Sequence, residues 1–124
     1  MNGESVKLTI PAKAEYLVML RLVASAIGGQ ADFDVDDIED LKTACSEACL
    51  LLIARAKKNT MLEVEFYVQE GVHAIIDASV DEAAERSPES EISMFLLEAL
   101  ADEVEFTEKD GKSTCELFKA PFPA

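Results

Sequence analysis

The sequence predicts an α+β fold: a two-layer sandwich in which three helices pack on one face of a mixed, mostly antiparallel sheet of about five strands. Three observations predict this class. Short segments alternate apolar and polar residues with the two-residue period of strands, and longer segments repeat apolar residues at the steps of a helical face. The order along the chain is strand, two helices, two strands, helix and two strands.

The first strand and helix are separated by a proline. Ser5–Ile10 alternates apolar and polar residues, which predicts a strand with one buried face, and Pro11 ends it. From Ala14 to Ile27 apolar residues form a broad helical face, and the pair Gly28 and Gly29 is predicted to stop this helix.

A long central helix is predicted from Asp34 to Lys58. Asp34 can cap its N-terminus, with Asp37 three residues on, and basic residues follow near its end. The spacing of its apolar residues predicts that one face is buried in the middle of the domain. The residues of that face are Ile38, Leu41, Cys45, Ala48 and Leu52.

The second half of the chain reads as two hairpins around a third helix. Met61–Val68 and Val72–Ala78 are predicted strands joined by a short turn, and Asp110-Gly111 is the expected turn of the last hairpin, Val104–Thr107 with Ser113–Phe118. Between the hairpins, Ser87 is the expected N-cap and Pro88 the first residue of the third helix. Its predicted apolar face consists of Ile92, Phe95, Leu96, Ala99 and Leu100.

Length and charge restrict the function. A chain of 124 residues, 49% of them hydrophobic, is expected to fold as a single domain over residues 1–124. The formal net charge of −14 argues against binding to nucleic acid or to an anionic membrane, and favours neutral or basic partners. No apolar run approaches the roughly 20 residues that span a bilayer, and no signal pattern opens the chain, so a cytoplasmic protein is expected.

Two groups of residues could be taken for sites but have simpler interpretations. Cys45, Cys49 and Cys115 could form a three-thiolate metal site, yet buried free cysteines are common in cores, and no metal is expected. His73 is the only histidine and lies in a predicted strand, where an exposed or structural role is expected.

Several motifs, together with the element order, resemble the anti-sigma-factor serine kinases of bacterial partner-switching systems, which belong to the GHKL ATPase group. The motifs are Ile10-Pro11-Ala12, Glu15-Tyr16, Arg21-Leu22, Asp36–Cys49 and Phe95–Val104. The resemblance implies a domain that binds ATP, sequesters a sigma factor and phosphorylates a serine on a small antagonist protein. It also implies that a homodimer is one expected assembly.

The first nucleotide motif of this family matches only in part. The family has a helical Glu, the general base, followed four residues later by an Asn that holds Mg²⁺. Here Glu47 fills the first position, while Leu51 stands at the second and offers no oxygen ligand. The resemblance therefore makes Glu47 a vestigial general base. The structural alternative is a helix carboxylate that is solvated or bonded to the Thr43 hydroxyl one turn back.

The other two motifs are also altered. In the family's Asp-x-Gly the Asp reads adenine; Asp77 matches it, but Ser79 replaces the glycine, and Asp77 can equally be a polar residue at a strand end. The glycine-rich phosphate turn corresponds to Ser90–Ser93, which contains no glycine, and Glu89 adds a carboxylate nearby.

Three hypotheses follow. The first is an anti-sigma-factor-like regulatory protein that binds a sigma factor or an anti-sigma antagonist, has a degenerate ATP site with little or no kinase activity, and needs no cofactor. The alternative is an active serine/threonine kinase that uses ATP and Mg²⁺ with Glu47 and Asp77. The third is a scaffold or dimerisation domain that binds no nucleotide.

Overall fold

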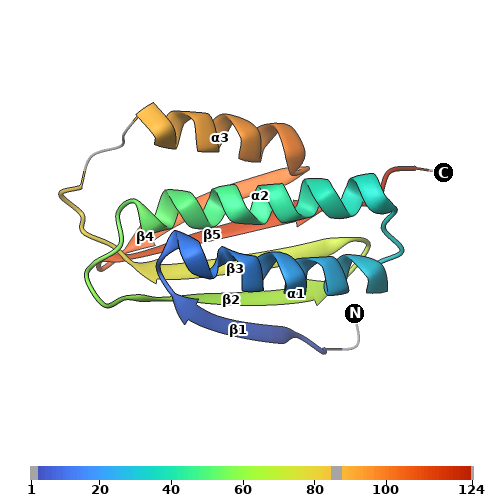
Figure 1. Cartoon of the computed structure of the whole chain (residues 1–124), viewed down its shortest axis with the longest axis horizontal. Helices are drawn as coiled ribbons and strands as arrows, with labels where there is room; N and C mark the ends of the chain where they lie inside the picture. The colour runs from blue at the N-terminus through green and yellow to red at the C-terminus, as the bar shows by residue number, and fades with distance from the viewer. Residues whose placement is uncertain (1–2, 85–87, 124) are drawn as a thin grey trace.

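The computed structural model describes residues 3–84 and 88–123 of the chain (Figure 1). The elements, in order, are β1 (Val6–Pro11), the 3₁₀ helix η1 (Ala14–Tyr16), α1 (Leu17–Gln30), α2 (Val35–Ile53), β2 (Met61–Val68), β3 (Val72–Ser79), α3 (Pro88–Leu100), β4 (Glu103–Lys109) and β5 (Lys112–Lys119).

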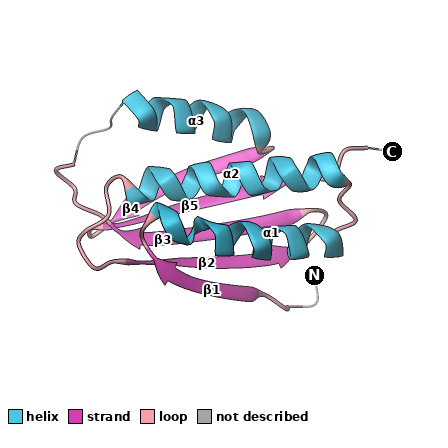
Figure 2. Cartoon of the chain, in the orientation of Figure 1, coloured by secondary structure: helices cyan, strands magenta, loops and turns pink. Residues whose placement is uncertain are grey.

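The five strands form one sheet in the order β1-β2-β3-β5-β4. All three α-helices lie on the same side of this sheet, with α2 between α1 and α3 (Figure 2). The predicted α+β two-layer sandwich is therefore confirmed. One detail differs, because every strand pair is antiparallel and the sheet is not mixed.

The hydrophobic core fills the space between the helices and the sheet. Strand alternation places every second side chain of β2 and β3 toward the helices, and α2 supplies the largest share of the helical side. The largest side chains that solvent does not reach are Leu20, Leu41, Leu62, Phe66, Ile76 and Leu97.

Helix α1 differs from its prediction at both ends. It begins after η1, and it runs through Gly28 and Gly29 to Gln30. Gly28 does not stop the helix because it is a packing position: a Cβ there would lie 3.0 Å from the Ile38 side chain and 3.3 Å from Phe33. The glycine thus lets α1 approach α2 closely.

Helix α2 begins as predicted and ends earlier. Asp34 and Asp37 form a reciprocal capping box at its start, which confirms the expected N-cap. The helix ends at Ile53 and not at Lys58, because the following backbone pairs with β3: the Lys57 amide donates to the Ser79 carbonyl at 3.1 Å.

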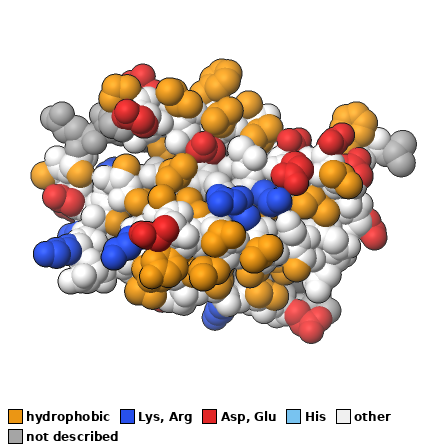
Figure 3. Space-filling view, viewed as in Figure 1, with side chains coloured by type: hydrophobic (Ala, Val, Ile, Leu, Met, Phe, Trp, Pro, Cys, Tyr) orange, Lys and Arg blue, Asp and Glu red, His pale blue; other side chains and the backbone are white. Residues whose placement is uncertain are grey.

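The predicted apolar face of α3 is wrong in its orientation. Ile92 and Phe95 are 61% and 72% exposed, whereas Ser90, Ser93 and Leu97 are buried. Small serine side chains let α3 pack against α2 on that side together with Leu97, so Ile92 and Phe95 point to solvent. Apolar side chains accordingly show on the surface along α3 and over α1 (Figure 3). Pro88 is the first helical residue as expected, and the predicted cap Ser87 lies outside the described residues.

Candidate functional site

Glu47 lies on α2 and points toward α3. Its side chain is half-buried, and its Oε2 accepts a hydrogen bond of 3.1 Å from the Ser93 hydroxyl. The partner is therefore on the neighbouring helix and is not the Thr43 hydroxyl, which the sequence suggested as an alternative. Since Ser93 is 8% exposed, the contact belongs to the packed boundary between two helices.

The position one helical turn after Glu47 is apolar and packed. Leu51 is 8% exposed and is part of the hydrophobic core. Side chains four residues apart on a helix project in the same direction, so the carboxylate of Glu47 has a hydrocarbon neighbour where an oxygen ligand would be needed for Mg²⁺. No metal could be shared between these two side chains.

Asp77 lies on the other side of the sheet. In β3 the flanking residues Ile76 and Ala78 are buried beneath the helices, so Asp77 faces away from them. Its Oδ1 accepts a hydrogen bond of 2.5 Å from the Thr114 hydroxyl, and its Oδ2 lies 3.7 Å from the Lys112 ammonium. The structure therefore does not bring Asp77 and Glu47 together.

The residue at the end of β3 that does face the helices is Ala78, which is 3% exposed. A carboxylate that reads a base from the helix side would have to occupy this position or another of the same parity. The alternation of apolar residues along Val72–Ser79 predicts from the sequence that Ala78 faces the helices and Asp77 does not. Matching Asp77 to the motif takes no account of this alternation.

The start of α3 is acidic. Glu89 and Glu91 lie in its first turn and are exposed, while Ser90 between them is 7% exposed. Carboxylates interact favourably with the positive end of the helix dipole, which is also where a phosphate would bind. The helix thus supplies its own anions at this end.

The three cysteines lie in the core as free thiols. Burial raises the pKa of Cys45 and of Cys115 to about 12, and it raises the pKa of Cys49 well above its ordinary value. Among residues 3–84 and 88–123, no group of three or more His, Cys, Asp or Glu is arranged to hold a metal ion. Metal binding by these thiols would require deprotonation in an apolar setting, which such pKa values oppose.

His73 has a structural environment. Its ring stacks on Tyr67, with centroids 4.4 Å apart and planes at 4°, and lies 4.5 Å from the Phe118 ring. Its Nε2 is 3.1 Å from the carbonyl oxygen of Gln69. These contacts lie on the side of the sheet without helices, because the buried Val72 and Ala74 flank His73 in β3.

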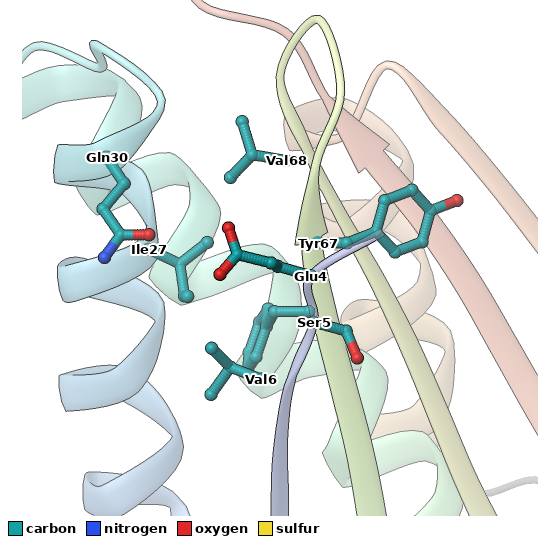
Figure 4. Close-up of a pocket in the computed structure, with 8 residues that line it drawn as sticks. Glu4, Ser5, Val6, Ile27, Gln30, Tyr67 and Val68 are labelled. Atoms are coloured by element: carbon teal, nitrogen blue, oxygen red, sulfur yellow. The ribbon is translucent and has the colours of Figure 1, made fainter. Parts of the chain in front are cut away.

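A hollow of about 550 Å³ lies at the end of the sheet away from Asp77, between the end of α1 and strands β1 and β2. Ile27, Gln30 and Val68 line it, and the Glu4 carboxylate points between them (Figure 4). None of the residues expected to bind nucleotide contributes to its wall. This hollow is therefore unrelated to the site predicted from the motifs.

Comparison with known proteins settles the family. A model of the histidine kinase-like ATPase domain matches residues 10–118, most of the chain. The chain belongs to this family. Among described residues, no helix is long and apolar enough to cross a membrane.

Similar proteins make the relationship more specific. The serine-protein kinase RsbW of Bacillus cereus strain B4264 is 28% identical over 128 residues, which cover 87% of this chain and 80% of that protein. RsbW of Bacillus thuringiensis strain Al Hakam and of Bacillus anthracis strain A0248 match to the same extent. These relatives confirm the resemblance to the serine kinases that the motifs of the sequence indicated.

Two solved structures share the fold. The RsbU and RsbW domains of Rv1364c from Mycobacterium tuberculosis superpose with a TM-score of 0.74 and 17% identity, covering 98% of this chain and 35% of that one. The histidine kinase domain of a blue-light-activated kinase from Erythrobacter litoralis gives a TM-score of 0.54 at 15% identity, covering 89% and 61%. Both matches support the fold assignment.

Proposed function

We propose that this protein is an anti-sigma-factor-like regulator of a bacterial partner-switching system, and that it acts by binding a partner protein and not by phosphorylating one. The partner is a sigma factor or an anti-sigma antagonist. The similarity to RsbW serine-protein kinases supports the regulatory system. The residues around Glu47 support the loss of kinase activity.

The observation that carries this proposal is the pair Glu47 and Leu51. Phosphoryl transfer depends on a metal ion that neutralises charge on the phosphates, and the helix presents a buried leucine one turn from the retained carboxylate. In addition, Ser93 donates a hydrogen bond to Glu47, so one oxygen of the proposed vestigial base is engaged within the protein.

The residues at the end of β3 also support the proposal. Ala78 occupies the helix-facing end of β3 and has no group that could read an adenine amino group. Asp77 faces away from α2 and is held by Thr114 and Lys112. A ligand between the helices and the sheet would therefore find no carboxylate from β3.

A titration with ATP and with ADP, each with and without Mg²⁺, tests the proposal by calorimetry and thermal shift. A ligand at 100 times its dissociation constant stabilises a protein by about 2.7 kcal/mol, which a thermal shift detects easily. We expect neither heat nor shift at millimolar nucleotide. Magnesium-dependent binding would contradict the proposal and favour the kinase alternative.

The retained carboxylate of Glu47 and the similarity to RsbW serine-protein kinases favour an active kinase. Incubation with Mg-ATP and the antagonist protein tests it directly. A phosphorylated antagonist, with the product abolished by Glu47→Gln, would establish the kinase. We expect no product from either protein.

Co-purification tests the third hypothesis. Salt-sensitive co-purification with a sigma factor would exclude a scaffold that binds no regulatory partner.

Leu51→Asn restores the missing oxygen ligand and provides a sharper test. We expect no nucleotide binding, because Ala78 and the acidic start of α3 remain, and a loss of about 2 kcal/mol from an amide buried among apolar residues. Leu22→Asn, at a position 67% exposed, is the matched control and should leave the free energy of unfolding nearly unchanged. Micromolar ATP binding by Leu51→Asn would contradict the proposal.

A further inference from the structure

The face of the sheet opposite the helices, called here the open face, is organised in rows that cross the strands. The three helices all lie on the other side (Figure 2). Strand register aligns the side chains of the open face into neighbouring rows. The aromatic row is Tyr67, His73 and Phe118, and Glu103 continues it on β4. The acidic row is Glu65, Ile75, Glu116 and Glu105, and Lys7 continues it on β1.

The aromatic row is a preformed surface. Tyr67 and His73 are stacked, and Phe118 lies against the other side of the His73 ring at 4.5 Å. Rings held by their neighbours lose little freedom when a ligand binds. Tyr67 and Phe118 cover the two sides of His73, so the face of this row that is turned toward β4 and can attract a cation belongs to Phe118.

The acidic row contains an electrostatic conflict. Glu105 of β4 lies directly opposite Glu116 of β5, and like charges in this position destabilise a sheet. Among the described residues, no Lys or Arg forms an ion pair with Glu103, Glu105 or Glu116. The basic residue of this row, Lys7 on β1, lies opposite Glu65 at the far end. The chain itself does not compensate these carboxylates.

The two rows enclose a hollow of about 210 Å³. His73 and Phe118 line it together with Glu103, Glu105 and Glu116, and Glu103 lies directly opposite Phe118. An arginine guanidinium fits this lining, because it is planar, stacks on aromatic rings and donates paired hydrogen bonds to carboxylates.

We propose that the open face is a docking surface for a basic segment of the protein partner, and that an arginine of this segment binds between the aromatic row and the three glutamates. The inference rests on the proposed function only in that the protein acts by binding a partner. The net charge of −14 complements such a segment and would accelerate its association.

The probe is a capped peptide of alternating arginine and glycine, with a citrulline peptide of the same length as the neutral isostere. Binding is followed through the backbone amide NMR signals of the isotopically labelled protein. We expect the arginine peptide to shift the signals of Ile75, Glu116 and Phe118 saturably, and the citrulline peptide to shift none. Equal shifts with both peptides, or shifts spread over the whole surface, would overturn the proposal.

Matched variants separate a specific site from overall charge. Glu105→Gln with Glu116→Gln should weaken the arginine peptide about tenfold. Glu91→Gln with Glu98→Gln removes the same charge from exposed positions on α3 and should change the affinity less than about twofold. If both double variants weaken binding equally, attraction is non-specific and the site is refuted.

Stability provides an independent readout. Removing the conflict at Glu116 by Glu116→Gln should leave the midpoint of urea unfolding unchanged or raise it, while peptide binding falls. A loss of stability together with binding would assign these glutamates a structural role and overturn the proposal.

A titration with Mg²⁺ distinguishes the docking surface from a metal site. Mg²⁺ should shift none of the same backbone amide signals, and saturable shifts with Mg²⁺ alone would overturn the docking surface in favour of a metal site. Nucleotide binding does not enter these outcomes, so failure here is distinct from failure of the proposed function.

Discussion

The two faces of β3 differ in their chemistry, although their residues alternate along one strand. The side chains of β3 that face the helices are apolar and at most 3% exposed: Val72, Ala74, Ile76 and Ala78. The side chains on the open face are His73, Ile75, Asp77 and Ser79. In this strand, the layer between helices and sheet serves packing, whereas groups able to bind a polar ligand lie on the other face.

The largest expected effect is on thiol reactivity, which tests whether the helix-covered face of the sheet excludes water. Burial raises the pKa of Cys45 and Cys115 from 9.0 to about 12, so the thiolate fraction at pH 8 falls about a thousandfold. We expect all three cysteines to react with a thiol reagent only after denaturation. A cysteine of the native protein that reacts as fast as a free thiol would show that water reaches the helix-covered face.

Adjacent isoleucines of β3 provide the next test. Ile76 is fully buried beneath the helices, and Ile75 is half-buried on the open face. Ile76→Ala should lower the free energy of unfolding by about 3 kcal/mol, because it leaves a cavity in the core. Ile75→Ala, the matched control, should lower it by about 1 kcal/mol or less. Equal losses in urea unfolding would mean that both faces are packed alike.

Local signals made part of this structure predictable. The Asp34 and Asp37 capping box and the Asp110-Gly111 turn depend on residues a few positions apart, and both form as predicted. Both turn residues have positive φ, 53° and 77°, as a tight hairpin requires.

The orientation of α3 could not be predicted in the same way. The apolar spacing of Ile92 and Phe95 favours a buried face, but the side that packs depends on how closely α2 approaches, and Ser90 and Ser93 are small enough to fill that boundary. By contrast, strand alternation in the sequence is sufficient to predict the side of the sheet on which Asp77 lies. The hydrogen bond from Ser93 to Glu47 joins residues 46 positions apart, and no local pattern indicates it.

Asp37 tests whether polar groups on the helix side serve structure. It is 4% exposed; it accepts from the Asp34 amide at 3.3 Å, and both its carboxylate oxygens lie 3.2 Å from the Phe122 amide nitrogen. Asp37→Ala should cost about 1 kcal/mol, because two donors lose their acceptor. Asp36→Ala, at an exposed position in the same turn, is the control for helix charge and should cost less. Equal losses in thermal unfolding would contradict this role.

The smallest effect concerns the ion pair that joins the segment after α2 to β4. Arg55 donates two hydrogen bonds to Glu108, at 2.7 and 3.2 Å, and these hydrogen bonds lower the pKa of Glu108 below 4.5. A carboxylate whose folded pKa is depressed stabilises the protein above its unfolded pKa and loses this contribution as pH falls through the folded value.

Glu108→Gln should therefore lower stability slightly at pH 7, and the difference from the unmodified protein should vanish on acidification below the folded pKa. Urea midpoints measured in steps from pH 7 downward follow this. Glu98→Gln, at an exposed position on α3, is the control for the loss of one negative charge. Because the pair is exposed, added salt should reduce the difference at pH 7. A difference that stays constant as the pH falls would mean that Glu108 contributes through packing and not through its charge. Polar residues at the sheet edge would then differ less from the residues of the apolar face than the two faces of β3 do.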